Sequence, residues 1–220
     1  MLRGEMMKKS IVVLGVLVMA SGAFANTYDG AGGDYSAWDN AYDGSLGSMF
    51  SSALVVGDQG ANIITSISVE VDNAHTWVGD LVIKLEGPAG LAVLLSRPGF
   101  DEPADDGTGC CGDSSNWVTG DAQTFVDGGS IPAEDLGAAQ PGSGDPIPAQ
   151  TLDPNDSLMA LFGGTAANGT WTLYIGDSAE FDTGALSGWT LNLTAIPEPA
   201  SLSLLALGGL AVIRRRRQNG

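Results

Sequence analysis

The middle of the chain contains short runs in which apolar and polar residues alternate. This period of two is typical of strands that bury one face. The Gly-Pro-Ala-Gly sequence at 87–90 predicts a tight turn that joins two of the runs as a hairpin. No stretch of helical period occurs between residues 26 and 197. The pattern therefore predicts an all-β fold, a jelly-roll-like antiparallel β-sandwich of six to nine short strands. The alternating runs cover residues 63–71, 81–85, 91–95, 124–126, 171–175 and 189–193.

The N-terminal 25 residues have the three-part layout of a secretory signal peptide. Basic residues come first, an apolar run follows at 11–20, and the small residues Ala23 and Ala25 close the segment. The apolar run is short for a helix that spans a bilayer, which needs about 20 apolar residues. We expect a signal helix that signal peptidase removes after Ala25. The alternative is an uncleaved membrane anchor.

The C-terminal end also carries a sorting pattern. Two prolines at 197 and 199 interrupt regular structure, an apolar helix is expected at 200–213, and four arginines follow, which stay on the cytoplasmic side of a membrane. In this order the segment resembles the PEP-CTERM sorting signal. The residues that carry the resemblance are Pro197, Glu198, Pro199, Arg214, Arg215, Arg216 and Arg217.

The PEP-CTERM resemblance implies recognition by an exosortase, an inner-membrane enzyme similar to transpeptidases. Cleavage is expected near Pro197, Glu198 and Pro199, with release or attachment of the protein at the cell surface. The tail contacts the membrane only before processing. Such substrates are usually linked to Gram-negative bacteria that produce exopolysaccharide, so exopolysaccharide or other matrix components are expected partners. The alternative is a tail anchor that is never cut.

These signals divide the chain into four parts. We expect a signal peptide at 1–25, an acidic glycine-rich segment at 26–51, a β-sandwich at 52–195 with a long loop at 100–150, and the sorting tail at 196–220.

Between residues 26 and 197 only Lys84 and Arg97 oppose 24 acidic residues, which gives a net charge of −22. This charge repels phosphates and anionic lipids and argues against a nucleic-acid partner.

The predicted sandwich resembles the P domain, or homo B domain, of proprotein convertases and exported bacterial proteins. The resemblance covers residues 52–194 and rests on segments at 66–94, 162–173 and 182–191 and on Asp177. It departs from the family at 100–150. It implies a jelly roll of about eight strands, which packs beside a protease domain in convertases. No protease accompanies it here.

The sequence indicates no catalytic site, so we expect a protein that is not an enzyme. The one histidine, His75, has no evident nucleophile, and no Gly-x-Ser-x-Gly elbow occurs. We interpret His75 and Trp77 as a structural corner of the sandwich, in which Asp80 accepts backbone N–H bonds; the alternative makes His75 a ligand or a base. A hydrolase that uses carboxylates alone stays a third function hypothesis.

Calcium is the one cofactor that the sequence suggests. Carboxylate and amide oxygens in turns are ligands that Ca²⁺ accepts, although no EF-hand spacing occurs and solvated aspartates are the alternative. Acidic stretches at 101–106 and 153–156 are equal candidates. The residues expected to contribute are Asp72, Asn73, Asp80, Asp177 and Asp182.

Two further features concern the mature domain. The adjacent cysteines Cys110 and Cys111 are expected to form a disulfide in an oxidising compartment, either with each other or between molecules. Four aromatic residues near the mature N-terminus either stack on sugar rings or fold back onto the sandwich. They are Tyr28, Tyr35, Trp38 and Tyr42.

Taken together, these patterns favour a non-catalytic surface or extracellular-matrix protein. Exosortase sorts it, and its sandwich mediates adhesion or matrix association. The alternative is a carbohydrate- or calcium-binding module.

Overall fold

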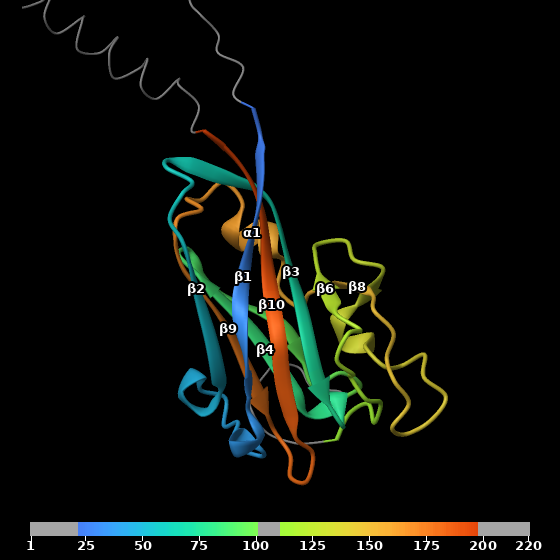
Figure 1. Cartoon of the computed structure of the whole chain (residues 1–220). Helices are drawn as coiled ribbons and strands as arrows, with labels where there is room; N and C mark the ends of the chain where they lie inside the picture. The colour runs from blue at the N-terminus through green and yellow to red at the C-terminus, as the bar shows by residue number, and fades with distance from the viewer. Residues whose placement is uncertain (1–21, 101–110, 198–220) are drawn as a thin grey trace, which may run out of the picture.

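Two β-sheets packed face to face form the core of the computed structural model, which describes residues 22–100 and 111–197 (Figure 1). One sheet has six strands, in the order β1-β10-β3-β6-β8-β7, and the other has four, in the order β2-β9-β4-β5. The larger sheet contains β1 (Phe24–Asp34), β10 (Gly184–Pro197), β3 (Asn62–His75), β6 (Gln123–Phe125), β8 (Thr151–Asp153) and β7 (Ile131–Pro132). The smaller contains β2 (Phe50–Val56), β9 (Gly169–Asp177), β4 (Leu81–Gly87) and β5 (Gly90–Ser96). The predicted all-β sandwich is confirmed.

Alternation along the central strands builds the core. In β3, Ile67, Val69 and Val71 point inward and are at most 2% exposed, while the residues between them are more open to solvent. The opposing strand β9 buries Trp171, Leu173 and Ile175 in the same way. The inner faces of the two sheets pack against each other and form one core. The turn at 87–90 joins β4 and β5, whose last and first residues pair, so the predicted hairpin is confirmed.

The region that follows β5 differs from the prediction. Between residues 111 and 157, three short strands extend the larger sheet, and β8 pairs in parallel with both β6 and β7. These two parallel pairings are exceptions in a sandwich whose other strand pairs are antiparallel, as predicted. Parallel neighbours need a longer connection than a hairpin, and the loops of this segment supply it.

Helical structure is minor among the described residues. The α-helix α1 (Leu158–Phe162) is capped by Ser157, whose hydroxyl accepts from the N–H of Ala160, and it is too short for a periodic signal. Four 3₁₀ turns complete the set: η1 (Ser36–Trp38), η2 (Leu46–Ser48), η3 (Val78–Asp80) and η4 (Ala133–Asp135). The helices expected at both ends of the chain lie outside the described residues. Within these, no helix combines the length and the apolar character that crossing a membrane requires.

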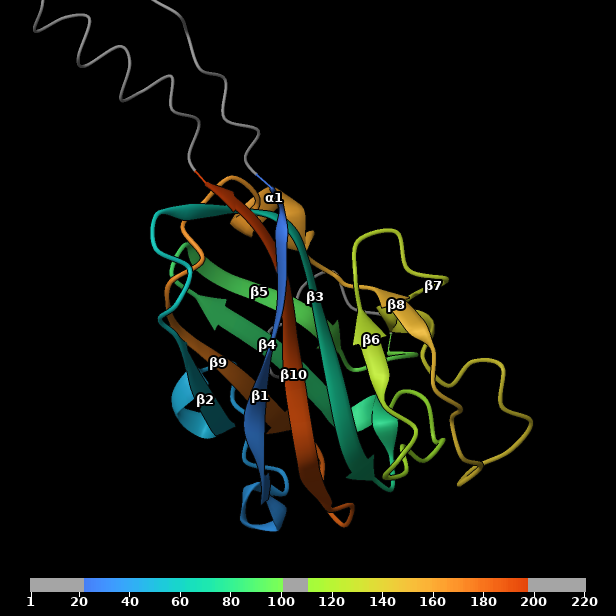
Figure 2. The ribbon, with the colours of Figure 1, turned by 45° about the horizontal axis from the view of Figure 1, so that its top comes forward.

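The two ends of the described chain leave the sandwich side by side. β1 and β10 are antiparallel neighbours, and Phe24 at the start of β1 pairs with Ala195 near the end of β10. Figure 2 shows both strands running to the same end of the molecule. His75 ends β3 at the opposite end, because β3 runs from Asn62, the partner of Pro197, to His75, the partner of Gly184. We call these the tail end and the His75 end.

Candidate functional site

The sorting motif starts inside the fold. Pro197, its first proline, is the last residue of β10 and pairs with Asn62 at the start of β3. Ala195 is fully buried and pairs with Ile64 on one side and Phe24 on the other. The strand that carries the motif is thus fixed between two neighbours up to two residues before the motif. Glu198, Pro199 and the arginines at 214–217 lie outside the described residues.

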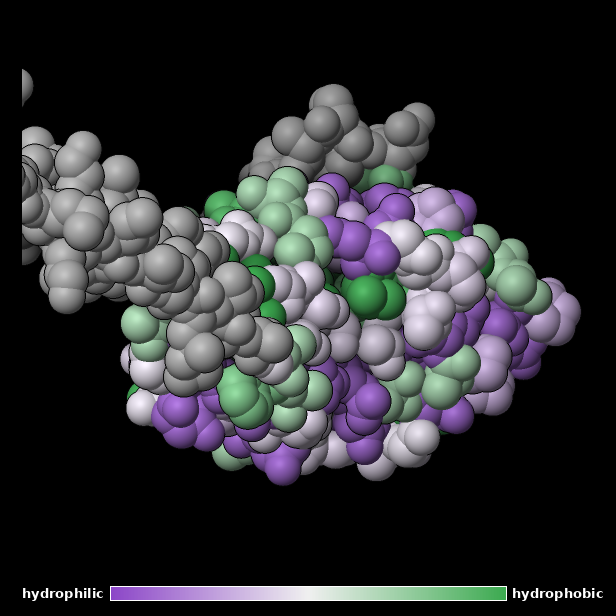
Figure 3. All heavy atoms as spheres, turned by 90° about the horizontal axis from the view of Figure 1, so that it is seen from above, coloured by the Kyte–Doolittle hydropathy of each residue, from purple (hydrophilic) through white to green (hydrophobic). Residues whose placement is uncertain are grey.

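The expected signal cleavage point lies within the adjacent strand. Ala25 pairs with Thr194, and Asn26, the expected first mature residue, pairs with Leu193. Seen from the tail end, hydrophobic and hydrophilic residues are mixed on the surface (Figure 3). Phe24 and Val55 are exposed by 55% and 72%. Because Ala25 pairs with Thr194, three residues before Pro197, both expected processing points lie at the tail end of the domain.

The His75 end contains a buried histidine–carboxylate pair. Nε2 of His75 lies 3.1 Å from Oδ2 of Asp177, and both side chains are almost completely buried. Nδ1 of His75 lies 2.8 Å from the carbonyl oxygen of Trp77. The ring of Tyr35 stacks on the imidazole with centroids 6.2 Å apart. Both ring nitrogens therefore contact protein atoms, and neither faces a hydroxyl or a thiol that it could activate.

Asp80 lies beside this pair and has an altered acidity. Burial, followed by the negative charge of Asp177, raises the pKa of Asp80 to about 6. The backbone N–H of Cys111 donates to its Oδ1 over 3.2 Å and opposes the rise. The expectation that Asp80 accepts a backbone N–H bond is met, although the donor comes from residue 111 and not from the local turn.

This raised pKa predicts a pH-dependent contribution to stability. The pKa of Asp80 in the folded protein lies above its unfolded value, so its contribution is complete below about pH 4 and is lost as the pH rises through about 6. We expect Asp80→Asn to remove this loss of stability with rising pH. Relative to wild type, its free energy of unfolding should gain about 1 to 2 kcal/mol between pH 4 and pH 7, after allowance for solvent screening.

Thermal melts of both proteins at several pH values measure this gain. Asp43→Asn is the matched control, because hydrogen bonds from Ser45 and Ser48 lower the pKa of Asp43 to about 2. Its contribution is present above pH 4 and lost toward pH 2, which is the opposite sign. A constant difference between Asp80→Asn and wild type across the range would contradict the assignment.

The aspartates proposed for calcium do not share one environment. Asp80 and Asp177 meet in the buried cluster, while Asp182 accepts a hydrogen bond of 2.6 Å from the Thr76 hydroxyl. Asp72 lies within β3 and accepts from the N–H of Gly120 over 2.8 Å. Asn73 accepts from the Tyr35 hydroxyl.

In the described ranges, no group of three or more His, Cys, Asp or Glu side chains could hold a metal ion. Calcium binding stays a prediction of the sequence alone.

Cys111 is disulfide-bonded, and its φ of 75° lies in the left-handed region. The sequence has one other cysteine, Cys110, which lies outside the described residues. The hydrogen bond from Cys111 to Asp80 connects this loop to the His75 end.

The aromatic residues near the N-terminus pack onto the sandwich. Tyr35 and Tyr42 are buried, with 1% and 5% exposure, and Tyr28 and Trp38 lie partly buried against the core. They therefore form no open platform for sugar rings. The most exposed aromatic residue of the described chain is Phe181, at 89%. Sequence reasoning missed it, because nothing in the local pattern distinguishes an exposed phenylalanine from a buried one.

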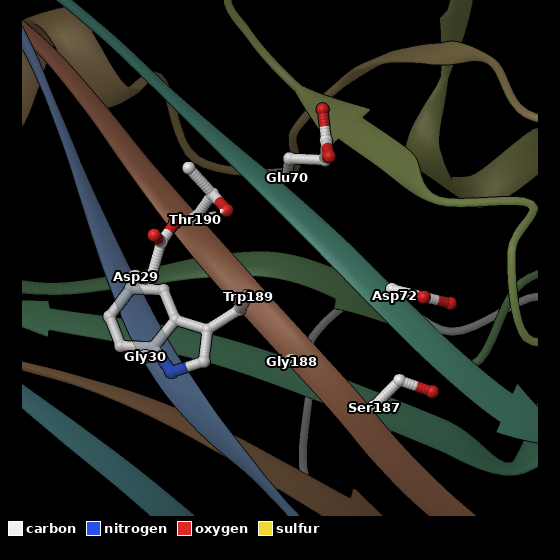
Figure 4. Close-up of a pocket in the computed structure, with 8 residues that line it drawn as sticks. All are labelled: Asp29, Gly30, Glu70, Asp72, Ser187, Gly188, Trp189 and Thr190. Atoms are coloured by element: carbon white, nitrogen blue, oxygen red, sulfur yellow. Dashed lines mark hydrogen bonds between the residues drawn. The ribbon is translucent and has the colours of Figure 1, made fainter.

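A shallow pocket lies on the outer face of the larger sheet, with a volume of about 260 Å³ (Figure 4). Asp29, Glu70 and Asp72 surround it, and the Thr190 hydroxyl donates to Asp29 over 3.1 Å. Gly188 contributes no side chain, which leaves the hollow between strands. Carboxylates and hydroxyls of this kind accept hydrogen bonds from polar ligands. The sequence could not show this pocket, because its residues come from three strands.

Comparison with known proteins identifies the tail. Residues 195–217 match the family model of the PEP-CTERM protein-sorting motif, which confirms that prediction. Among curated proteins no relative matches.

Two solved structures resemble the fold: the Aeromonas sobria serine protease in complex with its chaperone ORF2, and that protease alone. Sequence identity is 17% in both, with TM-scores of 0.43 and 0.41. The matches cover 84% and 82% of this chain but 28% of the other, so the chain spans less than a third of the length of the structures it matches.

Proposed function

From the sorting motif at its C-terminal end, we propose that the chain is a non-catalytic exported protein that an exosortase processes and whose β-sandwich mediates adhesion or matrix association. The PEP-CTERM motif implies export and a surface or extracellular location. The observation that carries the proposal is the direct continuation of β10 into this motif, at Ala195 to Pro197. The folded domain and its processing signal therefore form one continuous unit.

The His75 end supports a non-catalytic role. A histidine that acts as a base needs a substrate or a nucleophile within hydrogen-bonding reach. His75 is 2% exposed and contacts Asp177 and the backbone of Trp77. This arrangement stabilises the loops at the His75 end and leaves the imidazole inaccessible to substrate.

We further propose that the sandwich is a P-like domain. Support comes from the residues on which the resemblance rests. His75 and Asp80 belong to the first segment of the resemblance, and Asp177 to its second half. The fold brings these two halves together at the buried pair.

Glycan binding at the pocket of Asp29, Glu70 and Asp72 is the second candidate function. Its basis is the grouping of three carboxylates and two hydroxyl side chains around one hollow, since sugar hydroxyls donate to such oxygens. Calorimetry of the purified protein with neutral glycans separates this candidate from a purely structural role in a matrix.

The sorting proposal predicts a change in mature mass. In a cell that makes an exosortase, wild type should lose the C-terminal tail. Replacing Pro197, Glu198 and Pro199 together by alanine should leave the arginines at 214–217 attached and should reduce processing at least about tenfold, because the recognition motif is gone. Mass spectrometry of the mature protein measures both outcomes.

The matched control is Glu180→Ala, which removes an exposed glutamate at the opposite end of β10. It should be processed as wild type. Recovery of wild type from the surface fraction with an intact tail would contradict the proposed function.

A further inference from the structure

The expected signal cleavage point and the sorting motif lie close together on the neighbouring strands β1 and β10. The expected signal cleavage point, between Ala25 and Asn26, faces Thr194 and Leu193 across the β1–β10 ladder. The sorting motif follows three residues later, at Pro197. Cutting one strand therefore changes the pairing of the other.

Before signal cleavage, Thr194 and Ala195 lie between two partner strands, whereas Ile196 and Pro197 pair with β3 alone. Ala25 and Phe24 pair with Thr194 and Ala195 on one side. On the other side, β3 pairs with the same two residues through Ser66 and Ile64. This part of β10 is then an interior strand, with backbone groups bonded in both directions.

Signal cleavage removes one of these partners. Water hydrolyses the Ala25–Asn26 amide, which leaves a carboxyl group on Ala25 and an amino group on Asn26. Phe24 and Ala25 depart with the signal peptide, and the remaining β1 reaches only as far as Leu193. Residues 194–197 then keep β3 as their strand partner, and the register shift between Thr194 and Ala195 already interrupts that ladder.

An enzyme that cleaves a peptide binds it in an extended form with its backbone groups free, so a paired segment must open first. Opening an edge segment breaks fewer hydrogen bonds than opening an interior one. We propose that signal cleavage precedes sorting and promotes it, because removal of Phe24 and Ala25 turns the base of the sorting motif from an interior segment into an edge. This order rests on the proposed function.

In the sorting step, an exosortase breaks a peptide bond near Pro197 and passes the acyl group to water or to an amine. The rate follows the fraction of molecules in which residues 195–197 are open. Loss of one or two net hydrogen bonds raises that fraction about three- to thirtyfold. The uncut precursor should therefore be sorted about tenfold more slowly than the cut one.

The test uses the full chain in a cell that makes an exosortase, with pulse-chase labelling and mass spectrometry of the C-terminus. Ala25→Tyr blocks signal cleavage, because signal peptidase needs a small residue there, and tyrosine is well accepted in a strand. We expect tail processing to slow about tenfold. Two second-site changes should restore it although the signal stays attached: Phe24→Pro, which removes a backbone N–H from β1, and a Gly-Ser linker inserted between Ile196 and Pro197.

Processing of Ala25→Tyr at the wild-type rate would overturn the proposed order. Slow processing that neither second-site change restores would overturn it too, because the attached signal would then slow sorting by anchoring the chain and not by strand pairing. The linker variant with a cleavable signal tests the proposed function separately. If that variant and wild type both keep their tails, sorting itself fails.

Discussion

Trp171→Ala should lower the free energy of unfolding by about 3 to 5 kcal/mol. Trp171 is fully buried near the start of β9, and its ring packs against Phe162 with centroids 4.9 Å apart. Its indole N–H donates to the carbonyl oxygen of Ala167 over 3.2 Å. Truncation leaves a cavity between the sheets and an unpaired carbonyl. The melting temperature should fall by about 10 °C, since about 2 to 4 °C corresponds to each kcal/mol in a domain of this size.

Calorimetry or chemical unfolding measures the loss. Phe181→Ala is the control, because this phenylalanine is 89% exposed and packs little apolar area. Its free energy of unfolding should stay within about 0.5 kcal/mol of wild type. Equal losses in the two variants would contradict a core between β9 and the larger sheet.

The strands that alternate strictly were predictable. Burial on one face of β3, β9 and β10 follows directly from their period of two, whereas β4 is buried on both faces. The sorting tail was predictable for another reason, because its signal is contiguous and needs no tertiary contact. Both features depend on residues that are neighbours in sequence.

β1 could not be predicted in this way. It is polar and glycine-rich, with little apolar alternation, and its pairing with β10 depends on tertiary fit. At Gly30 a Cβ atom would lie 1.9 Å from the indole nitrogen of Trp189. Only glycine allows the strand to pass over that ring. The segment that the sequence presents as acidic and glycine-rich therefore contains an edge strand, whose path depends on one large neighbouring side chain.

The contact between His75 and Asp177 could not be predicted from the sequence, for a related reason. His75 and Asp177 are 102 residues apart, and no local pattern links a histidine at the end of one strand to an aspartate at the end of another. The sequence favoured a structural role for His75 because no nucleophile was evident. It did not identify the partner.

Asp177→Ala should destabilise the domain by about 2 to 4 kcal/mol at neutral pH. The change leaves the buried Nε2 of His75 without its acceptor and frees the N–H of Ala179, which donates to Oδ1 of Asp177 over 3.2 Å. Leaving a buried donor without its acceptor costs about 1 to 3 kcal/mol, and two donors lose theirs here. The total is smaller than twice that cost, because the negative charge that raises the pKa of Asp80 disappears with Asp177.

Chemical unfolding at pH 7 measures this loss, and Asp182→Ala is the matched control from the same end of the domain. Asp182 is only partly buried, and its one hydrogen bond to a side chain comes from the more exposed Thr76, so its removal should cost less than about 1 kcal/mol.

The double variant Asp80→Asn/Asp177→Ala adds a second check. Asp177→Ala removes the larger of the two like charges that raise the pKa of Asp80, the other being Asp182, so the gain from Asp80→Asn at pH 7 should be smaller there than in wild type. Equal gains in the two backgrounds would mean that the charge of Asp177 does not affect the pKa of Asp80.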